Sequence, residues 1–254
     1  MNTDRSLTGQ IDPNLSDCVF YHTIDIAGYG VVEGMRDTRG FFDSYIGNIQ
    51  LKGKTLLDIG TASGFFAFEA EKRGATVTAF DIASGASQVM LPFADSLFMN
   101  DRAAWIATAD ANLRGLRNSF WFCHKRLKSQ VRTLFSDFAE LARTPERFDI
   151  VMAGAILEHI SDPVSAIGLW CKLARETVVI PSTPLILSED LLMRPITSWD
   201  NPMYNYTWFE LSIGLYRRIF TNMGFRLHNV TYAKQIWVAE GRVIERPTIV
   251  AQRV

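Results

Sequence analysis

The sequence predicts an α/β fold built on a mostly parallel sheet with helices on both of its faces. Residues 55–81 read as a buried strand, a glycine loop, an amphipathic helix and a second strand, an alternation typical of parallel sheets. Further apolar runs suited to buried strands follow at 131–138, 148–155 and 177–180. Because the chain has 254 residues and 48% hydrophobic content, it can bury one large core of this kind.

The segment 55–81 also carries the chemistry of a nucleoside site. Leu56, Leu57 and Ile59 form the apolar run of a central strand, and Gly60 and Gly64 bracket a turn where backbone can approach a ligand closely. The helix over about 65–73 opens at this loop and points free N–H groups towards it. Asp81 follows about twenty residues later, where an acid at the end of the second strand can accept from both ribose hydroxyls.

The loop sequence distinguishes among nucleoside cofactors. A dinucleotide site needs G-x-G-x-x-G to admit a pyrophosphate, whereas this loop reads Gly60-Thr61-Ala62-Ser63-Gly64. Asp58, just before the loop, would repel a pyrophosphate but suits a ligand that carries an ammonium and a sulfonium. Together with Asp81, the loop resembles motif I of the class I methyltransferases that use S-adenosylmethionine (SAM), with Ala62 where many members have glycine. The resemblance implies a Rossmann-like class I methyltransferase fold, with a seven-stranded sheet and an antiparallel last strand.

Two later strand ends extend this resemblance. In the family, the acid after the third strand, here Asp137, accepts from the adenine amino group, and the segment after the fourth strand lies along the methionine part of the cofactor. Residues 156–163 then match the common L-E-H-x-x-D-P ending, in which Asp162 and Pro163 also suit the start of a helix. The cofactor-binding residues implied are Asp58, Gly60, Thr61, Ala62, Gly64, Asp81, Ile82, Asp137, Phe138, Ala153 and Gly154.

The other elements are expected around this core. In chain order, we expect an extended segment over 20–26, a turn at 28–30, and helices over 43–49, 115–127 and 163–174. Thr207-Trp-Phe-Glu210 is a capping-box pattern and predicts a helix from there to about Met223. A closing strand pair is expected over 225–232 and 248–252.

We expect two regions along the chain. Residues 1–50 form an N-terminal strap and helix that cover the site, and 51–254 form the SAM-dependent methyltransferase domain. Long connections at about 83–130 and 182–206 stand where shorter ones are usual, and the second is rich in proline and aromatic residues. Because loops after parallel strands meet at the ligand-binding edge, these insertions are expected to form a lid over the acceptor.

Flanking motifs narrow the resemblance to one group of bacterial methyltransferases. Tyr21-His-Thr-Ile-Asp, the ending Phe120-Trp-Phe-Cys-His-Lys-Arg-Leu and the late Asn205-Tyr-Thr-Trp-Phe-Glu resemble the group that includes the enzyme completing 5-carboxymethoxyuridine in tRNA. That enzyme uses a carboxylated SAM and carries a tyrosine where this chain has Glu158. Since an anionic Glu158 beside an anionic carboxymethyl group is unfavourable, we expect ordinary SAM and transfer of a methyl group.

Candidates for catalysis and acceptor binding come from the same segments. His159 and Glu158 are candidate general bases beside the donor, although packing and helix entry explain the L-E-H motif equally well. Methyl transfer gains much of its rate from orientation and exclusion of water, so no conspicuous catalytic dyad is required. The candidate acceptor-binding residues, from the strap and the second insertion, are Tyr21, His22, Tyr204, Tyr206 and Trp208.

Composition limits the partners. The net charge of −1 creates no general attraction for nucleic acid. The basic residues between Arg114 and Arg132 are interpreted as a solvated helix face. Binding of nucleic acid is therefore not favoured, but it is left open. Cys18, Cys123 and Cys171 lack the spacing of a disulfide framework or a zinc site, and no metal is expected. We expect a cytoplasmic protein without membrane insertion, and a homo-oligomer is left open.

Three functions remain. The first is a SAM-dependent methyltransferase acting on a small-molecule or glycan-like acceptor, at oxygen or nitrogen with carbon left open. The second is a tRNA-modifying methyltransferase, based on the closer resemblance and the basic helix. The third is a non-catalytic subunit of the same fold that binds a partner through its aromatic insertion.

Overall fold

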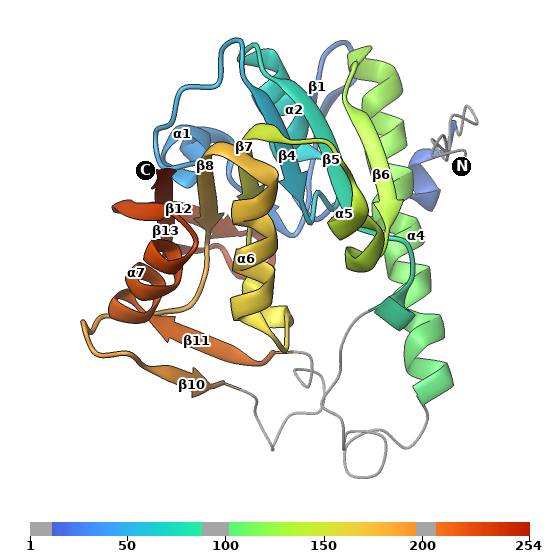
Figure 1. Cartoon of the computed structure of the whole chain (residues 1–254). Coiled ribbons are helices and arrows are strands. Elements are labelled where there is room, and N and C mark those ends of the chain that lie inside the picture. Colours follow the sequence, from blue (N-terminus) through green and yellow to red (C-terminus); the bar gives the residue numbers. More distant parts are fainter. Residues whose placement is uncertain (1–11, 88–101, 197–206) are drawn as a thin grey trace.

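The computed structural model describes residues 12–87, 102–196 and 207–254 and shows an α/β fold around one main sheet (Figure 1). Its strands are β3 (Arg36–Asp37), β4 (Thr55–Ile59), β5 (Thr76–Ile82), β6 (Arg132–Ser136), β7 (Phe148–Ala153), β8 (Ala174–Pro181), β12 (Phe225–Trp237) and β13 (Arg242–Arg253). They lie in the order β3-β12-β13-β8-β7-β4-β5-β6. The predicted seven strands are all present, and the two-residue β3 adds an eighth at the edge.

Pairing within the sheet confirms the predicted directions. Strands β4 to β8 pair in parallel, whereas β13 is antiparallel to both β8 and β12. The strand order reverses between β4 and β7, because β5 and β6 continue on one side and β8 on the other. In such sheets ligands bind beyond the carboxyl ends of the strands at this reversal point.

Helices cover both faces, as predicted. The described helices are α1 (Phe42–Tyr45), α2 (Phe65–Lys72), α4 (Arg102–Leu127), α5 (Phe138–Arg143), α6 (Pro163–Leu173) and α7 (Ile213–Asn222). Alternate side chains of β4 separate the two layers: Leu56 packs in the cluster with α1, α2 and α4, and Leu57 packs in the cluster with α5, α6 and α7. The helix expected over 43–49 is shorter than predicted, and the one expected over 115–127 is longer.

The N-terminal strap packs along α4. It contains the turn η1 (Leu15–Asp17) and the hairpin of β1 (Ile24–Ile26) and β2 (Gly30–Val32), which places the predicted turn at 28–30. Val19 donates its N–H to the Gly115 carbonyl at 3.0 Å, and Ser119 Oγ donates to the Val19 carbonyl at 2.6 Å. A β-carbon on Gly115 would lie 2.5 Å from Val19, so glycine permits this close approach.

The second insertion contributes two strands to a small sheet whose third strand follows the insertion, and here one prediction is wrong. β11 (Phe209–Ser212) pairs with β9 (Leu185–Ile186) and β10 (Met193–Pro195), and Figure 1 shows β10 and β11 below the central sheet. The pattern at Thr207–Glu210 therefore does not cap a helix. Ser212 is the N-cap of α7, and its hydroxyl accepts from the Leu215 N–H at 3.2 Å.

The closing strands are longer than predicted. Pro181 at the end of β8 pairs with Thr248, yet β12 and β13 continue pairing up to Trp237 and Arg242, across the turn η6 (Val238–Glu240). The two-stranded ribbon over 233–247 therefore extends past the carboxyl end of β8. β3 of the strap pairs with it, so strap and ribbon meet at the ligand-binding edge of the sheet.

Candidate functional site

The glycine loop after β4 has a conformation that its residues permit. Gly60 has φ +81° and Gly64 has φ +88°, and Ala62 between them is held at φ +49°. A β-carbon on Gly60 would lie 2.5 Å from Ile156 Cγ2. The N–H groups of Gly60 and Thr61 both donate to the Phe80 carbonyl, at 2.9 and 3.1 Å, so the loop is fastened to β5. This packing accounts for the glycine pattern on which the sequence prediction rests.

Asp81 connects the two strand ends. Its Oδ2 accepts from the Ala62 N–H at 2.9 Å, and its Oδ1 accepts from the Ile82 N–H at 2.8 Å. Burial raises the pKa of the Asp81 carboxyl, and the two backbone donors oppose that rise. Asp81, which is predicted to accept hydrogen bonds from the ribose, thus lies beside the glycine loop, and the two backbone donors fix the orientation of its carboxylate.

Asp58 is buried directly beneath the loop. Only 3% of its surface is exposed, and burial, with the Asp81 carboxylate nearby, raises the pKa of Asp58 to about 7. The Thr61 hydroxyl is close enough to the Asp58 carboxylate to oppose this rise in pKa, whereas Asp58 Oδ2 has no hydrogen-bond partner among the residues that the structure describes. Unsatisfied buried polar atoms are costly in a folded protein and mark places where a ligand can supply the missing partner.

The ends of β6 and β7 complete the edge. Asp137 caps α5 by accepting from the Glu140 N–H at 2.7 Å, and the ring of Phe138 packs against Phe80 with centroids 5.3 Å apart. At the end of β7, Ala153 is fully buried, and Gly154, the next residue, is half-buried. Asp137 therefore caps a helix, as aspartates in turns commonly do. Its hydrogen bond with the adenine amino group of a cofactor stays a prediction.

Glu158 and His159 lie on the short turn η4 (Leu157–His159) that follows β7. Burial raises the pKa of Glu158 to about 7, and its Oε2 lacks a hydrogen-bond partner in the described part of the chain. The Glu158 carbonyl accepts from the Trp208 N–H at 2.6 Å, which brings the segment that follows the second insertion to this turn. As predicted, Asp162 caps α6 and Pro163 is its first residue.

The strap brings Tyr21 and His22 to the same edge. The His22 N–H donates to Ser63 Oγ of the glycine loop at 3.3 Å, and its ring packs edge-on against Phe66 at 4.9 Å. Burial lowers the pKa of His22 to about 3, so this imidazole is neutral. Tyr21 lies beside Arg36 and Glu158, and burial raises the pKa of its phenol.

Of the predicted acceptor residues in the second insertion, Trp208 is buried, with 8% of its surface exposed. Its carbonyl accepts from the Ile196 N–H at 2.9 Å. Tyr204 and Tyr206 lie outside the described residues.

One residue at the site was not predicted. Tyr45, on α1, has its hydroxyl 2.7 Å from the position that a β-carbon on Gly154 would occupy. Sequence reasoning placed this residue in a helix of the strap and gave no reason to single it out. No motif or spacing marks it, because the contact joins segments more than a hundred residues apart.

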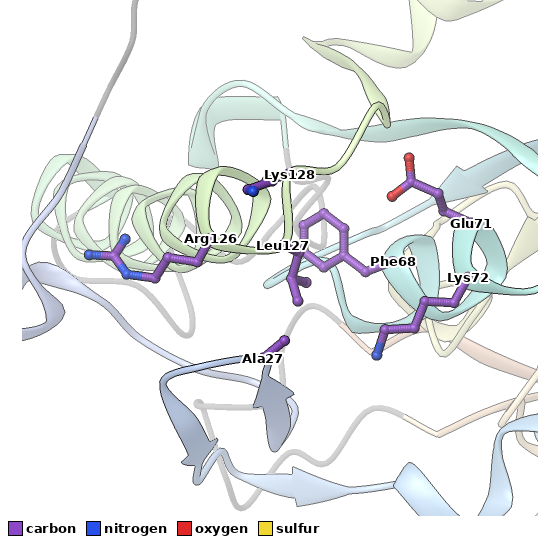
Figure 2. Close-up of a pocket in the computed structure, with 7 residues that line it drawn as sticks. All are labelled: Ala27, Phe68, Glu71, Lys72, Arg126, Leu127 and Lys128. Carbon is purple, nitrogen blue, oxygen red and sulfur yellow. The ribbon is translucent and has the colours of Figure 1, made fainter.

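Two cavities elsewhere in the described residues differ from this site. Figure 2 shows one of about 420 Å³, lined by Ala27, Phe68, Glu71, Lys72, Arg126, Leu127 and Lys128. The Glu71 carboxylate there already accepts from Ser129 and from the Gln130 N–H. Neither this cavity nor the second, of about 530 Å³ beside Phe41 and Ile236, includes the glycine loop.

Two further properties concern the described ranges 12–87, 102–196 and 207–254. They contain no group of three or more His, Cys, Asp or Glu side chains arranged to hold a metal ion. None of their helices has both the length and the apolar character needed to cross a membrane.

Comparison with known proteins agrees with this architecture. A family model described as "Methyltransferase domain" matches residues 39–230. Ubiquinone biosynthesis O-methyltransferase of Alkalilimnicola ehrlichii is 28% identical over 126 residues, which are 49% of this chain and 39% of that protein. The matched part therefore spans well under half of that relative.

Solved structures are similar in fold. Magnesium protoporphyrin IX methyltransferase of Synechocystis PCC 6803, crystallised with bound SAM, superposes with a TM-score of 0.52 at 14% identity, over 84% of this chain and 76% of that one. An O-methyltransferase family protein from Burkholderia thailandensis has the same TM-score and identity, over 84% of this chain and 55% of its own.

Proposed function

We propose that this chain, which belongs to the methyltransferase domain family and is a SAM-dependent methyltransferase, methylates a small-molecule or glycan-like acceptor. Oxygen and nitrogen are the favoured acceptor atoms, and carbon is left open. The observation that carries the proposal is the set of buried polar atoms without partners at the reversal point of the sheet, among the residues described. They are His22 Nδ1, Asp58 Oδ2 and Glu158 Oε2.

These residues suit SAM. When bound, SAM supplies a methyl group on a positively charged sulfonium. Asp81 has the position and fixed orientation to accept from the ribose hydroxyls, and Ile82 and Phe138 offer apolar contact to the adenine. Asp58 provides a buried carboxylate for the cationic methionine part, beside the backbone of Gly60 and Gly154. The glycines of the loop let it pack closely on Ile156, Phe68 and Phe120, which fixes the loop at the start of α2.

Glu158 is the better general-base candidate. A base acts best when its pKa lies near the working pH, and burial brings the pKa of Glu158 to about 7. Its unpartnered Oε2 is available to accept a proton from an acceptor hydroxyl or ammonium. His159 on the same turn is the alternative base. In either case the residues around this turn have to exclude water and hold the acceptor in line with the methyl group.

The acceptor side is apolar and aromatic. Tyr21 of the strap and Trp208 lie at the turn that carries Glu158, and His22 lies at the glycine loop. An enclosed aromatic wall suits a small, partly apolar acceptor. The Alkalilimnicola relative is named as an O-methyltransferase, and this similarity favours oxygen as the methylated atom.

A tRNA acceptor, suggested by the closer resemblance, is less well supported. Several of the basic residues that could follow a nucleic-acid backbone make contacts within the protein. Arg117 donates to the Ala83 carbonyl at 2.7 Å, Arg126 lies 3.4 Å over the Phe122 ring, and Lys125 pairs with Asp12 at 2.6 Å. Nucleic-acid binding needs several free cations on one surface.

A methyl-transfer assay with a panel of acceptors tests this proposal. Phenols, catechols, amino sugars and unmodified tRNA are incubated with SAM, and formation of S-adenosylhomocysteine is measured. We expect turnover with a small acceptor and none with tRNA. For the active acceptor, Glu158→Gln should lower kcat by about 10²- to 10⁴-fold and remove the rise in rate near pH 7. Turnover of tRNA alone would contradict the proposal.

A further inference from the structure

One face of the ribbon over 233–247 carries three arginine side chains. Residues directly opposite each other on paired strands share a face of the sheet, so Arg242 lies on the face of Trp237, its partner. Arg36 of β3 also pairs with Trp237, and both guanidinium groups lie over the indole, at 3.9 Å for Arg36 and 4.6 Å for Arg242. Arg246 pairs with Ala233, four residues before Trp237, and therefore shares the same face.

This face of the ribbon lies next to the turn that carries Glu158. The Ala155 N–H donates to the Pro181 carbonyl at 2.9 Å, which joins the start of that turn to the end of β8. Pro181 in turn pairs with Thr248 of β13. Arg246 stands two residues before Thr248, on the same face and beyond the end of β8. The ribbon thus brings the Arg246 side chain to the ligand-binding edge of the sheet.

Four side chains gather there, which we call the arginine cluster: Tyr21, Arg36, Glu158 and Arg246. The Arg36 guanidinium lies 5.9 Å from the centroid of the Tyr21 ring. Burial raises the pKa of the Tyr21 phenol, and Arg36 and Arg246 are near enough to oppose that rise. Burial likewise raises the pKa of Glu158 to about 7, again opposed by Arg246. The cluster therefore joins the strap, the turn η4 and the ribbon.

The Arg246 guanidinium is available to a ligand. Its side chain is exposed, and it forms no hydrogen bond or ion pair with any residue that the structure describes. Glu158 Oε2, although near, also lacks a hydrogen-bond partner among those residues. Arginine usually binds a carboxylate through two parallel hydrogen bonds, and here its donors have no such partner within the described chain.

The charge of the arginine cluster indicates what it can bind. With Glu158 ionised, two guanidinium groups and one carboxylate leave a net charge of +1. Positive charge beside the sulfonium of SAM is unfavourable unless an anion lies between or beside them. A carboxylate supplies the single negative charge that balances the cluster, whereas a phosphate dianion exceeds it.

We propose that the acceptor is a small hydroxy- or amino-substituted carboxylic acid, and that Arg246 binds its carboxylate and determines this specificity. This inference rests on the proposed function. With the carboxylate held at Arg246 and the positive charge of Arg36 nearby, the hydroxyl or amine of the acceptor can reach Glu158, while its apolar part contacts Tyr21. An acceptor without the carboxylate leaves Arg246 unpaired beside a cationic donor and binds more weakly.

Acceptors offered in pairs, each as the free acid and as its neutral amide, test this inference. Hydroxybenzoates, dihydroxybenzoates, aminobenzoates and glucuronate are used with SAM, and formation of S-adenosylhomocysteine is followed. For the pair that turns over, we expect the acid to have a KM about 10- to 100-fold lower than the amide, because the charge-assisted hydrogen bonds form only with the acid. This comparison needs no variant of the protein.

Variants then assign the effect to Arg246. Arg246→Gln should raise the KM of the acid by about 10- to 100-fold with a smaller change in kcat, and leave the KM of the amide unchanged. Arg246→Lys should be intermediate, because it keeps the charge but loses the paired donors. Lys234→Gln is the matched control, since Lys234 adjoins Ala233 and its side chain lies on the opposite face of the ribbon. It should change neither KM.

A binding measurement separates recognition from turnover. The protein saturated with S-adenosylhomocysteine is titrated calorimetrically with acid and amide, and the dissociation constants should follow the same pattern as KM. Equal affinity for acid and amide, or turnover confined to acceptors without a carboxylate, would overturn the inference. So would equal losses for acid and amide in Arg246→Gln, since Arg246 would then act through Glu158. Failure of the unmodified protein to bind SAM would instead overturn the proposed function.

Discussion

The carboxylate of Asp81 accepts a hydrogen bond from the backbone N–H of Ala62 at 2.9 Å, which joins the end of β5 to the middle of the glycine loop after β4. The two elements that the sequence marks most clearly are thus in direct contact. Ala62 is held at φ +49° in this arrangement, a conformation that costs energy for a residue with a β-carbon. The same contact orients the carboxylate that we assign to the ribose of SAM.

Replacement of Asp81 by alanine should weaken SAM binding by about 100-fold, because charge-assisted hydrogen bonds to two hydroxyls contribute about 1.5–3 kcal/mol. Calorimetric titration measures the change. Asp149→Ala is the control, since Asp149 accepts from the Thr55 N–H at 2.8 Å at the opposite edge of the same sheet. It should lower the melting temperature and leave the dissociation constant unchanged; equal losses of affinity in both variants would contradict the assignment.

SAM affinity should increase as pH rises through about 7. Burial raises the pKa of Asp58 to about 7, so below that pH the cationic cofactor must displace a proton to gain a carboxylate partner. Titration at pH 6 in buffers of different ionisation enthalpy should show release of a proton. Asp58→Asn should bind more weakly and lose the pH dependence. A pH-independent affinity in the unmodified protein would exclude Asp58 as the partner of the cation.

His22 should make the protein sensitive to acid. Burial lowers the pKa of His22 to about 3, so below about pH 6.5 the unfolded chain binds a proton that the folded protein does not. The contribution of this neutral histidine is therefore complete above pH 6.5, and it declines as pH falls towards 3, by about 1.4 kcal/mol per pH unit. Denaturant unfolding of His22→Phe between pH 4 and 7 should show a shallower acid loss. An identical slope would mean that His22 titrates normally.

Gly64→Ala should destabilise the protein by about 2–4 kcal/mol, since both overpacking and a left-handed backbone are costly. The added β-carbon would lie 2.5 Å from the Phe68 ring and 2.7 Å from Phe120. Gly53→Ala is the matched control, because Gly53 also has a positive φ, at +75°, but has no atom within 4 Å of the new carbon. Thermal unfolding should show a clearly smaller loss of stability for Gly53→Ala than for Gly64→Ala. Equal losses would mean that backbone strain alone, without overpacking, accounts for the destabilisation.

The parts of the fold that depend on residues close together in the sequence were predicted correctly. The apolar run before Gly60, the helix that begins at Phe65 and the acid at Asp81 form one continuous strand-loop-helix-strand unit, and the structure has each where it was expected. Asp162 and Pro163 likewise begin α6, because capping depends on residues a few positions apart.

Elements that depend on distant partners were predicted poorly. The residues at 207–210 satisfy a capping pattern, yet Phe209 to Ser212 pair with β9 and β10, and that pairing overrides the local preference. The ribbon over 233–247 was missed because it depends on pairing of β12 with β13, as between Ile236 and Val243, and local spacing does not reveal such pairing. Tyr45 was missed for a related reason: its importance comes from contact with Gly154, which no spacing in the sequence encodes.

Calorimetric titration of the purified protein with SAM tests the central claim most directly, because it asks only whether the edge between β4 and β7 holds this cofactor. We predict saturable binding at one site per chain, with S-adenosylhomocysteine competing for it. A folded protein that gives no binding heat with either compound, or that binds a nicotinamide dinucleotide in their place, would contradict the account.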